Sequence, residues 1–551
     1  MKMHSWIRNL FARTVNRPFC RAQFRARPAL EVLEDRWVPS AIVVNNPTDT
    51  PVAGLIDLRQ AIAMANTNVG DDTITFDKTV FNTPTTITLG GTQLELTDTT
   101  GATTITGPNK GVTVDAGGNS RVFQVDPSVT ASISGMTITG GKTAGAGGGL
   151  YNDRGTLTLT NCTVNGNTST QGGVLLAGGG LANYFGTTKL SNCTVSGNSA
   201  PNEAGGGLNS AGGTLTLTGC NVLGNSAPYG GGMWSNAGPG NPTTVTLTNC
   251  TVSGNSAGSD SSAGFGGGVG IQNTTLTLTN CTISGNTARG SSGGGGGLLA
   301  ISGTTTLTNC TISGNSVPGS YGSGGGVQTS YGKTALTNCT ISGNSVGFNG
   351  GGLANYGDNT TLTNCTISGN SSGFTGGGVG NTSTPGTTTT LTGCTVKGNS
   401  AVIGGGIWNT ATLIVDSSNI INNQATSAGG GISTTGGSAT ITNSVINSNQ
   451  VISSGTALGG GIDCENSSLS LNNDTVSANQ ANGVNAYGGG IYALNSTVDV
   501  ENSTVNGNQA NGTGEHKGGG IYASNTTLTL VNTIVKGNKA STPYDDIFNG
   551  P

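Results

Sequence analysis

A glycine triplet that returns fourteen times sets the tightest limit on how this chain can fold. An aliphatic residue or Met follows each triplet, then a strand-like run such as Thr156–Leu159, then a second run such as Cys281–Ile283. The triplets begin at Gly147, Gly178, Gly205, Gly230, Gly266, Gly295, Gly324, Gly350, Gly376, Gly404, Gly429, Gly459, Gly488 and Gly518. Self-similarity at a period of about 20 to 50 residues indicates a repeat architecture, in which similar units stack on one another.

The repeats have one constant half and one variable connection. A column that starts with Cys162 and ends with Thr533 advances in thirteen steps of about 28.5 residues. In eleven of the fourteen units, 15 residues separate the first triplet glycine from this column, so nearly all length variation falls before the next triplet. Each unit therefore has a fixed strand segment and a variable loop on one side.

The order of apolar residues predicts a bend between the two strand-like runs. Leu157 and Leu159 lie on one face of an extended chain, and Cys162 and Val164 lie on one face as well, but the two pairs are out of phase. A corner at Asn161 corrects the phase, because Asn tolerates the left-handed conformation that such a bend needs. Three short strands per unit then point their apolar residues inward.

Parallel stacking of these units gives an all-β fold. We predict a single-stranded right-handed parallel β-helix, since parallel crossovers are overwhelmingly right-handed. It should have about fifteen coils of about 28 to 29 residues, the first near Ile133–Ile138, and a short N-terminal capping helix. A glycine in regular structure costs about 0.5–1 kcal/mol relative to Ala. The triplets therefore predict either positive φ angles or a close approach between stacked corners.

Three segments follow from charge and pattern. Residues 1–40 hold eight Lys and Arg against three acidic residues, and we predict a basic targeting or export segment, with a disordered tail as the alternative. Residues 41–130 should form the N-terminal cap and first irregular coils, and residues 131–551 the β-helix repeats. Within the cap, Asp57 and Gln60 suit a capping box for a short amphipathic helix that covers the open end of the solenoid.

The repeat resembles that of a known family. The triplet with its aliphatic residue and the Ile283-x-x-Asn286 motif are similar to the GGA-I and F-x-x-N repeats of polymorphic outer-membrane proteins. Leu58, Arg59 and Ala61 match the Cys-Ser-Leu-Arg-Glu-Ala signature that heads many bacterial β-helix surface proteins. The resemblance implies a surface β-helix over residues 55–551. Polymorphic outer-membrane proteins end in a translocating domain, and because thirteen residues follow Asn538 we expect no self-insertion into an outer membrane.

The N-terminal segment carries a second resemblance. Leu33–Arg36 with Pro39 and Ser40 resembles the LE-x-LEDR-x-x-PS segment near the start of many planctomycete surface proteins. This implies export from a bacterium, and a secreted or cell-surface location.

Composition argues against several partners and cofactors. Beyond residue 40 the chain has 22 acidic and 13 basic residues, a balance that does not suit a phosphate backbone, so we expect no nucleic-acid partner. No run of 18 apolar residues exists, and we expect no transmembrane segment. The residue after each aliphatic position is rarely acidic, which argues against a calcium-binding solenoid. With His4 and His516 as the only histidines and no C-x-x-C pair, we expect no zinc site and no cofactor.

Nine of the eleven cysteines occupy one column. They are Cys162, Cys193, Cys220, Cys250, Cys281, Cys310, Cys339, Cys365 and Cys394. Later coils place Ser, Asp or Thr there, so the position requires a small side chain. Stacked parallel strands have parallel Cβ vectors, which favours a ladder of buried free thiols, with some disulfides as the alternative. The Asn columns of Asn161 and Asn167 should form corner amide ladders.

Aromatic residues on both sides of the triplets point to a binding surface. Those just after the inward aliphatic residue should face outward, where aromatic rings among Ser, Thr and Asn suit sugars. The candidate glycan-stacking residues are Tyr151, Trp234, Trp408, Tyr492 and Tyr522, and further aromatics precede triplets at Tyr229, Phe265, Phe348, Phe374 and Tyr487. Contacts between coils are the alternative explanation for this pattern.

Three function classes remain. A noncatalytic binding or adhesive surface, toward an extracellular polysaccharide or cell-envelope component, fits best. A polysaccharide lyase or glycoside hydrolase is the alternative, because Asp463 with Glu465, and Asp499 with Glu501, give two carboxylate pairs on neighbouring coils. No Arg or Lys lies among them, and a solvated edge is the explanation that we favour for these carboxylates. A structural matrix component is the third class.

Overall fold

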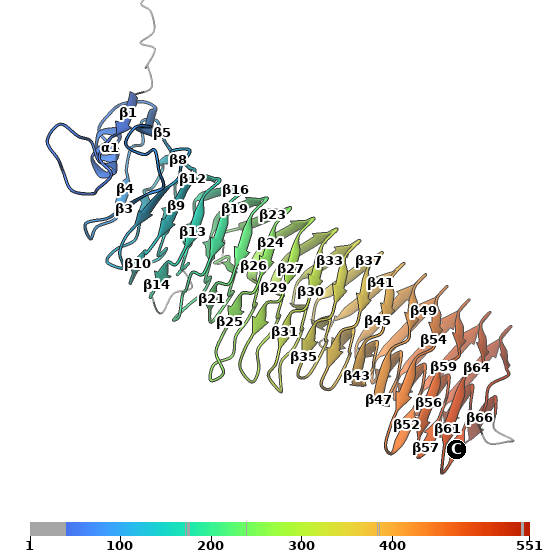
Figure 1. Cartoon of the computed structure of the whole chain (residues 1–551). Coiled ribbons are helices and arrows are strands. Elements are labelled where there is room, and N and C mark those ends of the chain that lie inside the picture. The colour runs from blue at the N-terminus through green and yellow to red at the C-terminus, as the bar shows by residue number, and fades with distance from the viewer. Residues whose placement is uncertain are drawn as a thin grey trace, which may run out of the picture. The chain divides into compact units, whose positions relative to one another are not determined.

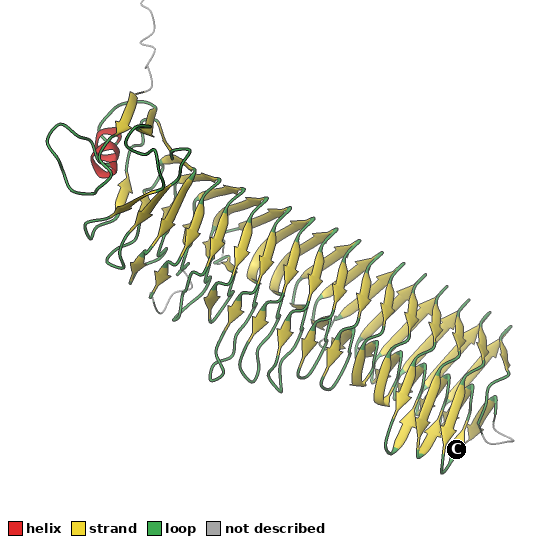
Figure 2. Ribbon diagram, viewed as in Figure 1, coloured by secondary structure: helices red, strands yellow, loops and turns green. Residues whose placement is uncertain are grey.

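The computed structural model describes residues 40–170, 172, 177–238, 240–382, 384, 386–540 and 545–550. The predicted targeting segment lies outside the described residues, except for Ser40. The described residues form a stack of β-coils with a single helix among them at its N-terminal end (Figures 1 and 2). The predicted all-β parallel solenoid is confirmed.

One coil illustrates the repeat. It contains β11 (Leu150–Asp153), β12 (Thr156–Thr160), β13 (Thr163–Asn165) and the short β14 (Thr168–Ser169). The first three strands pair in parallel with their equivalents in the next coil, so that Leu159 lies opposite Leu190 and Val164 opposite Val195. The first two strands of successive coils form a 33-stranded sheet, and the third strands form a 17-stranded sheet. The inward residues of both sheets make one continuous core.

The coil count is higher than the sequence predicts. The 17-stranded sheet runs from β3 (Thr85–Thr88) through β6 (Val112–Asp115) and β9 (Met136–Thr139) to β65 (Ile534–Lys536). The solenoid therefore has about 17 turns rather than about fifteen. The two additional turns precede the first glycine triplet. Because they lack a triplet, the sequence did not distinguish them from the irregular first coils.

A fourth strand, present in most coils from β21 onward, was not predicted. β21 (Ser226–Ala227), β25 (Ser256–Ala257) and β28 (Thr287–Ala288) belong to a further parallel sheet of 14 short strands. Its alanines are buried between coils. The sequence does carry a signal for it, because Ala, Ser or Val lies two positions after each coil Asn, but strands this short show no recognisable period.

The triplet glycines satisfy both predicted requirements at different positions. All fourteen first glycines have φ between 59° and 73°, which is the left-handed region. The third glycine of a triplet is limited by space instead: a Cβ on Gly297 would lie 2.6 Å from the carbonyl oxygen of Gly326 in the next coil. The triplet therefore combines a left-handed turn with a close backbone approach between stacked coils.

Asparagines hold the two corners of each coil. Asn161 adopts the predicted left-handed conformation, with φ of 53°. At the second corner the amide Nδ2 of Asn286 donates to Oδ1 of Asn315 at 2.9 Å, and Asn315 donates in turn to Asn344 at 3.0 Å. Asn315 Nδ2 also donates to the backbone carbonyl of Ile283 at 3.0 Å. The predicted amide ladder is confirmed here as a buried, fully bonded column.

The nine column cysteines are free and buried, as predicted. Each thiol lies inside the coil beside the Asn corner, where Cys310 Sγ donates to the carbonyl of Thr308 at 3.3 Å. The backbone N–H of Cys310 points at Sγ of Cys339 in the next coil, 3.5 Å away. From Ser418 onward hydroxyl groups, and at one position the carboxylate of Asp474, replace the thiols and accept the equivalent backbone N–H.

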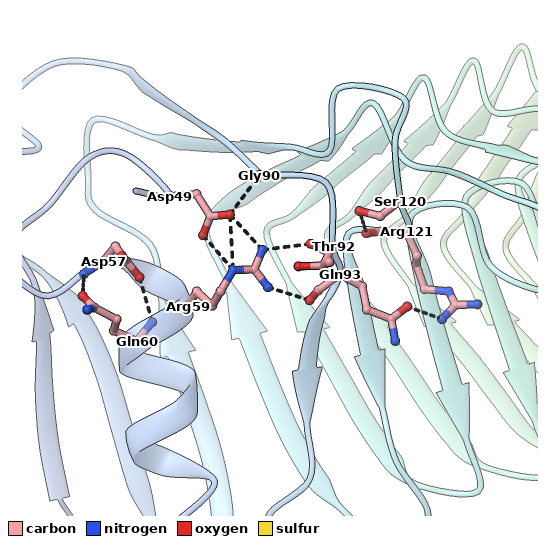
Figure 3. Close-up of polar contacts among 9 residues, drawn as sticks. All are labelled: Asp49, Asp57, Arg59, Gln60, Gly90, Thr92, Gln93, Ser120 and Arg121. Atoms are coloured by element: carbon pink, nitrogen blue, oxygen red, sulfur yellow. Dashed lines mark hydrogen bonds and ion pairs between the residues drawn. The ribbon is translucent and has the colours of Figure 1, made fainter. Parts of the chain in front are cut away.

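The N-terminal helix closes one end of the core. The helix α1 (Leu58–Ala65) has the predicted capping box, in which Gln60 N–H donates to Asp57 Oδ1 at 2.7 Å and Asp57 N–H donates to Gln60 Oε1 at 3.1 Å. Figure 3 shows that Arg59 ties the helix to the first coils through Asp49 and through the carbonyls of Thr92 and Gln93. Its apolar face is buried. The predicted cap is confirmed.

Candidate functional site

Outward side chains on both sides of the triplet line up along the stack. We consider five consecutive coils that contain β22 (Met233–Asn236), β26 (Val269–Thr279), β29 (Leu298–Thr308), β32 (Val327–Ser330) and β36 (Leu353–Tyr356). The residues before the triplets are Tyr229, Phe265, Gly294, Ser323 and Asn349; the second residues of the strands are Trp234, Gly270, Leu299, Gln328 and Ala354; the fourth are Asn236, Gln272, Ile301, Ser330 and Tyr356. We call these fifteen positions the corner face.

An aromatic pocket lies at the N-terminal end of the corner face. The pocket has a volume of about 320 Å³, and Tyr229, Trp234, Phe265, Gln272 and Ile301 line it.

 The rings of Tyr229 and Phe265 are stacked, with centroids 5.7 Å apart and planes 10° apart, and the Tyr229 ring lies 5.6 Å from that of Trp234. Tyr229 is 37% exposed, so its ring is accessible from solvent. The pocket presents aromatic faces with one amide side chain, that of Gln272, at its edge.

Trp234 corrects one sequence prediction. Strand alternation does turn its side chain away from the core, opposite to Met233, but the residue is only 2% exposed because Ala204, Leu299 and Phe265 pack around it. Its ring lies over Gly270, where an added Cβ would be 2.3 Å from the ring atom Cε3. The indole Nε1–H is buried and has no hydrogen-bond partner in the described parts of the chain. Trp234 therefore forms the wall of a pocket and not an exposed platform.

The other four candidate stacking residues share the register column of Trp234 but lie apart from it. Tyr492 is a second correction, since it is 7% exposed and stacks on Tyr522 at 5.2 Å. Tyr522 is half-buried and stacks in turn on Phe548 at 4.8 Å. These contacts between coils are the alternative that the sequence left open. Side chains of neighbouring coils cover such rings, an effect that strand parity alone does not predict.

Trp408 and Tyr151 are both half-buried. Trp408 lies on β44 (Ile407–Asn409), between the small residues Gly380 and Ser433 of the adjacent coils. Tyr151 lies beneath the guanidinium of Arg121, which is 5.0 Å from the ring centroid. Burial raises the pKa of Tyr151 to about 12. Neither residue shares the aromatic pocket.

The first carboxylate pair is on β53 (Ile462–Glu465), and one of its members is buried. Asp463 is 2% exposed, and its Oδ2 accepts a hydrogen bond from Ser433 Oγ at 2.7 Å. Its Oδ1 has no partner within the described residues. Burial, and then the charge of Glu465, raise the pKa of Asp463 to about 8, against the opposing effect of the Ser433 hydrogen bond. This carboxyl group is therefore largely protonated at neutral pH.

The second pair, Asp499 and Glu501, lies on β59 (Thr497–Glu501). The register places Asp499 opposite Ser470 and Thr529, whereas Asp463 lies opposite Ser433 and Tyr492. Neither aspartate therefore faces another carboxylate in a neighbouring coil. The two pairs occupy different strands of the 33-stranded sheet, β53 and β59.

Two further observations concern metals and membranes. Among the described residues, no three His, Cys, Asp or Glu side chains gather closely enough to hold a metal ion. Across the same residues, the structure contains no helix with the length and apolar character needed to cross a bilayer.

Sequence reasoning missed two polar members of the corner face. Gln272 lines the aromatic pocket, and Gln328 lies three coils further along the column of Trp234. Gln328 Oε1 is buried without a partner in the described residues. The alternation that places Trp234 outward also applies to Gln328, so this signal was present in the sequence. Gln328 was missed because only the aromatic residues of this column were considered as candidates.

Comparison with known proteins identifies the family. The model of the right-handed β-helix region matches residues 100–295 and 267–446, which together cover more than half of the chain. Among solved structures, the chain is similar to pectate lyase Pel9A, with 15% sequence identity, a TM-score of 0.34, and a match over 60% of this chain and 75% of that chain. A search of curated proteins gives no significant match. The chain belongs to the right-handed β-helix family.

Proposed function

We propose that this protein is a noncatalytic carbohydrate-binding protein that holds a sugar ring in the aromatic pocket. The observation that carries this proposal is the unpartnered indole N–H of Trp234, buried beside the stacked rings of Tyr229 and Phe265. A sugar offers what the pocket lacks: an apolar C–H face for the rings and hydroxyl oxygens that accept from an N–H. An unmet buried donor is costly, so a ligand acceptor adds affinity.

Binding is favoured over cleavage by the placement of the carboxylates. Asp463 is the buried acid with a raised pKa, but it lies on β53 opposite Tyr492 of the next coil, outside the aromatic pocket, whose lining residues include no carboxylate. The half-buried Trp408, Tyr151 and Tyr522 are proposed as secondary stacking positions along the same column. We also propose a secreted or cell-surface location, which rests on the basic segment at residues 1–40.

Two substitutions in the pocket test this function on the full chain. Trp234→Phe keeps the packing but removes the N–H, and Tyr229→Ala removes a stacking ring. Each should weaken glycan binding by about 1 kcal/mol, the usual contribution of one hydrogen bond or one aromatic contact. A glycan array would find the ligand, and titration calorimetry would measure the affinity of each variant.

Tyr321→Ala is the matched control, because Tyr321 is 71% exposed and lies outside the pocket. It should leave the affinity unchanged. Equal losses in the control and the pocket variants would contradict the assignment of the site. Reducing-sugar release that disappears in Asp463→Asn would instead establish the enzyme alternative.

A further inference from the structure

The corner face changes character along the stack. Past the aromatic pocket, the next coils present Ser323, Gln328, Asn349 and Tyr356. The Tyr356 hydroxyl shares a hydrogen bond with Ser323 Oγ at 2.7 Å and accepts one from Asn349 Nδ2 at 2.9 Å. Along the stack, the aromatic pocket is thus followed by hydroxyl and amide groups at equivalent positions of successive coils.

Two buried polar atoms on this face have no partner within the described residues. Trp234 Nε1 is a donor, and Gln328 Oε1 is an acceptor. The Gln328 side chain lies over Gly294, where an added Cβ would be 2.2 Å from Oε1. The two residues share a column and are three coils apart, a separation of about 14 Å at about 4.8 Å per coil. One sugar ring is too short to satisfy both, whereas an extended oligosaccharide spans them.

The corner face is uncharged. None of its fifteen positions holds Asp, Glu, Lys or Arg. Charged side chains recur on the equivalent columns only toward the two ends, at Asp153 and at Asp463, Glu465 and Lys517. A ligand carboxylate or sulfate placed on this face would lose hydration with no cation to replace it, which is strongly unfavourable.

We infer that the ligand is a neutral linear polysaccharide that runs along the stack, from the aromatic pocket past Gln328 to Tyr356. This rests on the proposed function and specifies its ligand class. One sugar stacks in the pocket and accepts from Trp234. Hydroxyl groups further along the ligand donate to Gln328 Oε1 and exchange hydrogen bonds with the Tyr356 hydroxyl, which Asn349 holds in place.

The test compares polymers that differ only in charge. Neutral glucan, mannan and galactan are titrated into the full chain, beside the same polymers oxidised at C6 to uronates. We expect the oxidised form of the bound polymer to bind at least about tenfold more weakly, because its carboxylates find no cation on the corner face. Equal or tighter binding of the oxidised form overturns the neutral-ligand inference while leaving the proposed function intact. Binding of no polymer, neutral or oxidised, overturns both.

The extension past the pocket is tested with a charge at Gln328, outside the pocket on the proposed path of the ligand. Gln328→Glu should weaken binding of the neutral polymer by about tenfold and leave binding of a disaccharide, which fills only the pocket, unchanged. The matched control is Gln450→Glu on β51 (Gln450–Ile452), outside the corner face, which should change neither affinity. An unchanged polymer affinity in Gln328→Glu, with the variant folded by circular dichroism, overturns the extended ligand and confines binding to the pocket.

Discussion

Replacement of Gly297 by Ala is expected to destabilise the solenoid by about 3 kcal/mol or more, although it adds a single methyl group. The new Cβ would lie 2.6 Å from the carbonyl oxygen of Gly326 and 3.0 Å from the amide of Asn315. Neither group can move away without weakening hydrogen bonds that it makes. The Gly326 carbonyl accepts from Leu298 N–H at 2.9 Å, and Asn315 belongs to the buried amide ladder. Overpacking at such a site shifts backbone and costs one to several kcal/mol, as an order of magnitude.

Gly314→Ala in the same repeat is the matched control. Gly314 has φ of 61°, and an added Cβ would meet no atom within 4 Å. Its cost is therefore the conformational penalty of a left-handed residue alone, about 1–2 kcal/mol. Urea denaturation of both variants would measure the two costs. A larger loss for Gly314→Ala than for Gly297→Ala would contradict close packing as the reason for the third triplet glycine.

Backbone requirements were the most predictable part of this fold. Glycine triplets and corner asparagines are specific because few residues tolerate a left-handed turn, so their spacing alone locates the corners. The capping box at Asp57 and Gln60 was predictable for the same reason, since it is a local hydrogen-bond pattern. Features without such a signature were missed: the two turns before Gly147, and the two-residue strands such as β21.

The candidate site was less predictable, because burial of an outward residue depends on the neighbouring coils. Strand alternation places Trp234 and Tyr492 outside the core, and it does so correctly. It does not reveal that Leu299, two coils further on, packs against Trp234, or that Tyr522 covers Tyr492. Those contacts follow from the stacking register, which only the structure provides. The same register separates the two carboxylate pairs.

The pH dependence of stability should be dominated by Asp463. An unfolded aspartate has a pKa of about 3.9, whereas burial holds the pKa of folded Asp463 at about 8. Between these values the unfolded chain is ionised here and the folded chain is not, so unfolding releases a proton. The stabilising contribution is full below about pH 4, decreases by about 1.4 kcal/mol per pH unit, and is lost as the pH passes 8. The total change is on the order of 5 kcal/mol.

Asp463→Asn should remove this dependence, because the amide keeps an oxygen for the Ser433 hydroxyl and does not ionise. Glu465 lies beside Asp463, and Ser433 and Tyr492 face it from the two adjacent coils. The variant and the natural chain should differ little at pH 4, and the variant should be the more stable one at pH 8. Urea midpoints at pH 4, 6 and 8, with hydrogen exchange of β53, would measure this difference.

A second buried aspartate provides the control for the pH window. Asp474 occupies the cysteine column, where burial raises its pKa to about 6 and the backbone N–H groups of Ser444 and Asn472 oppose the rise. Asp474→Asn should therefore change the slope only between about pH 4 and 6 and leave the decline between pH 6 and 8 in place. If Asp463→Asn kept the natural slope between pH 6 and 8, the ionisation of Asp463 would not be its source. Another group would then release the proton on unfolding, and Asp463 would not be buried in its neutral, protonated form.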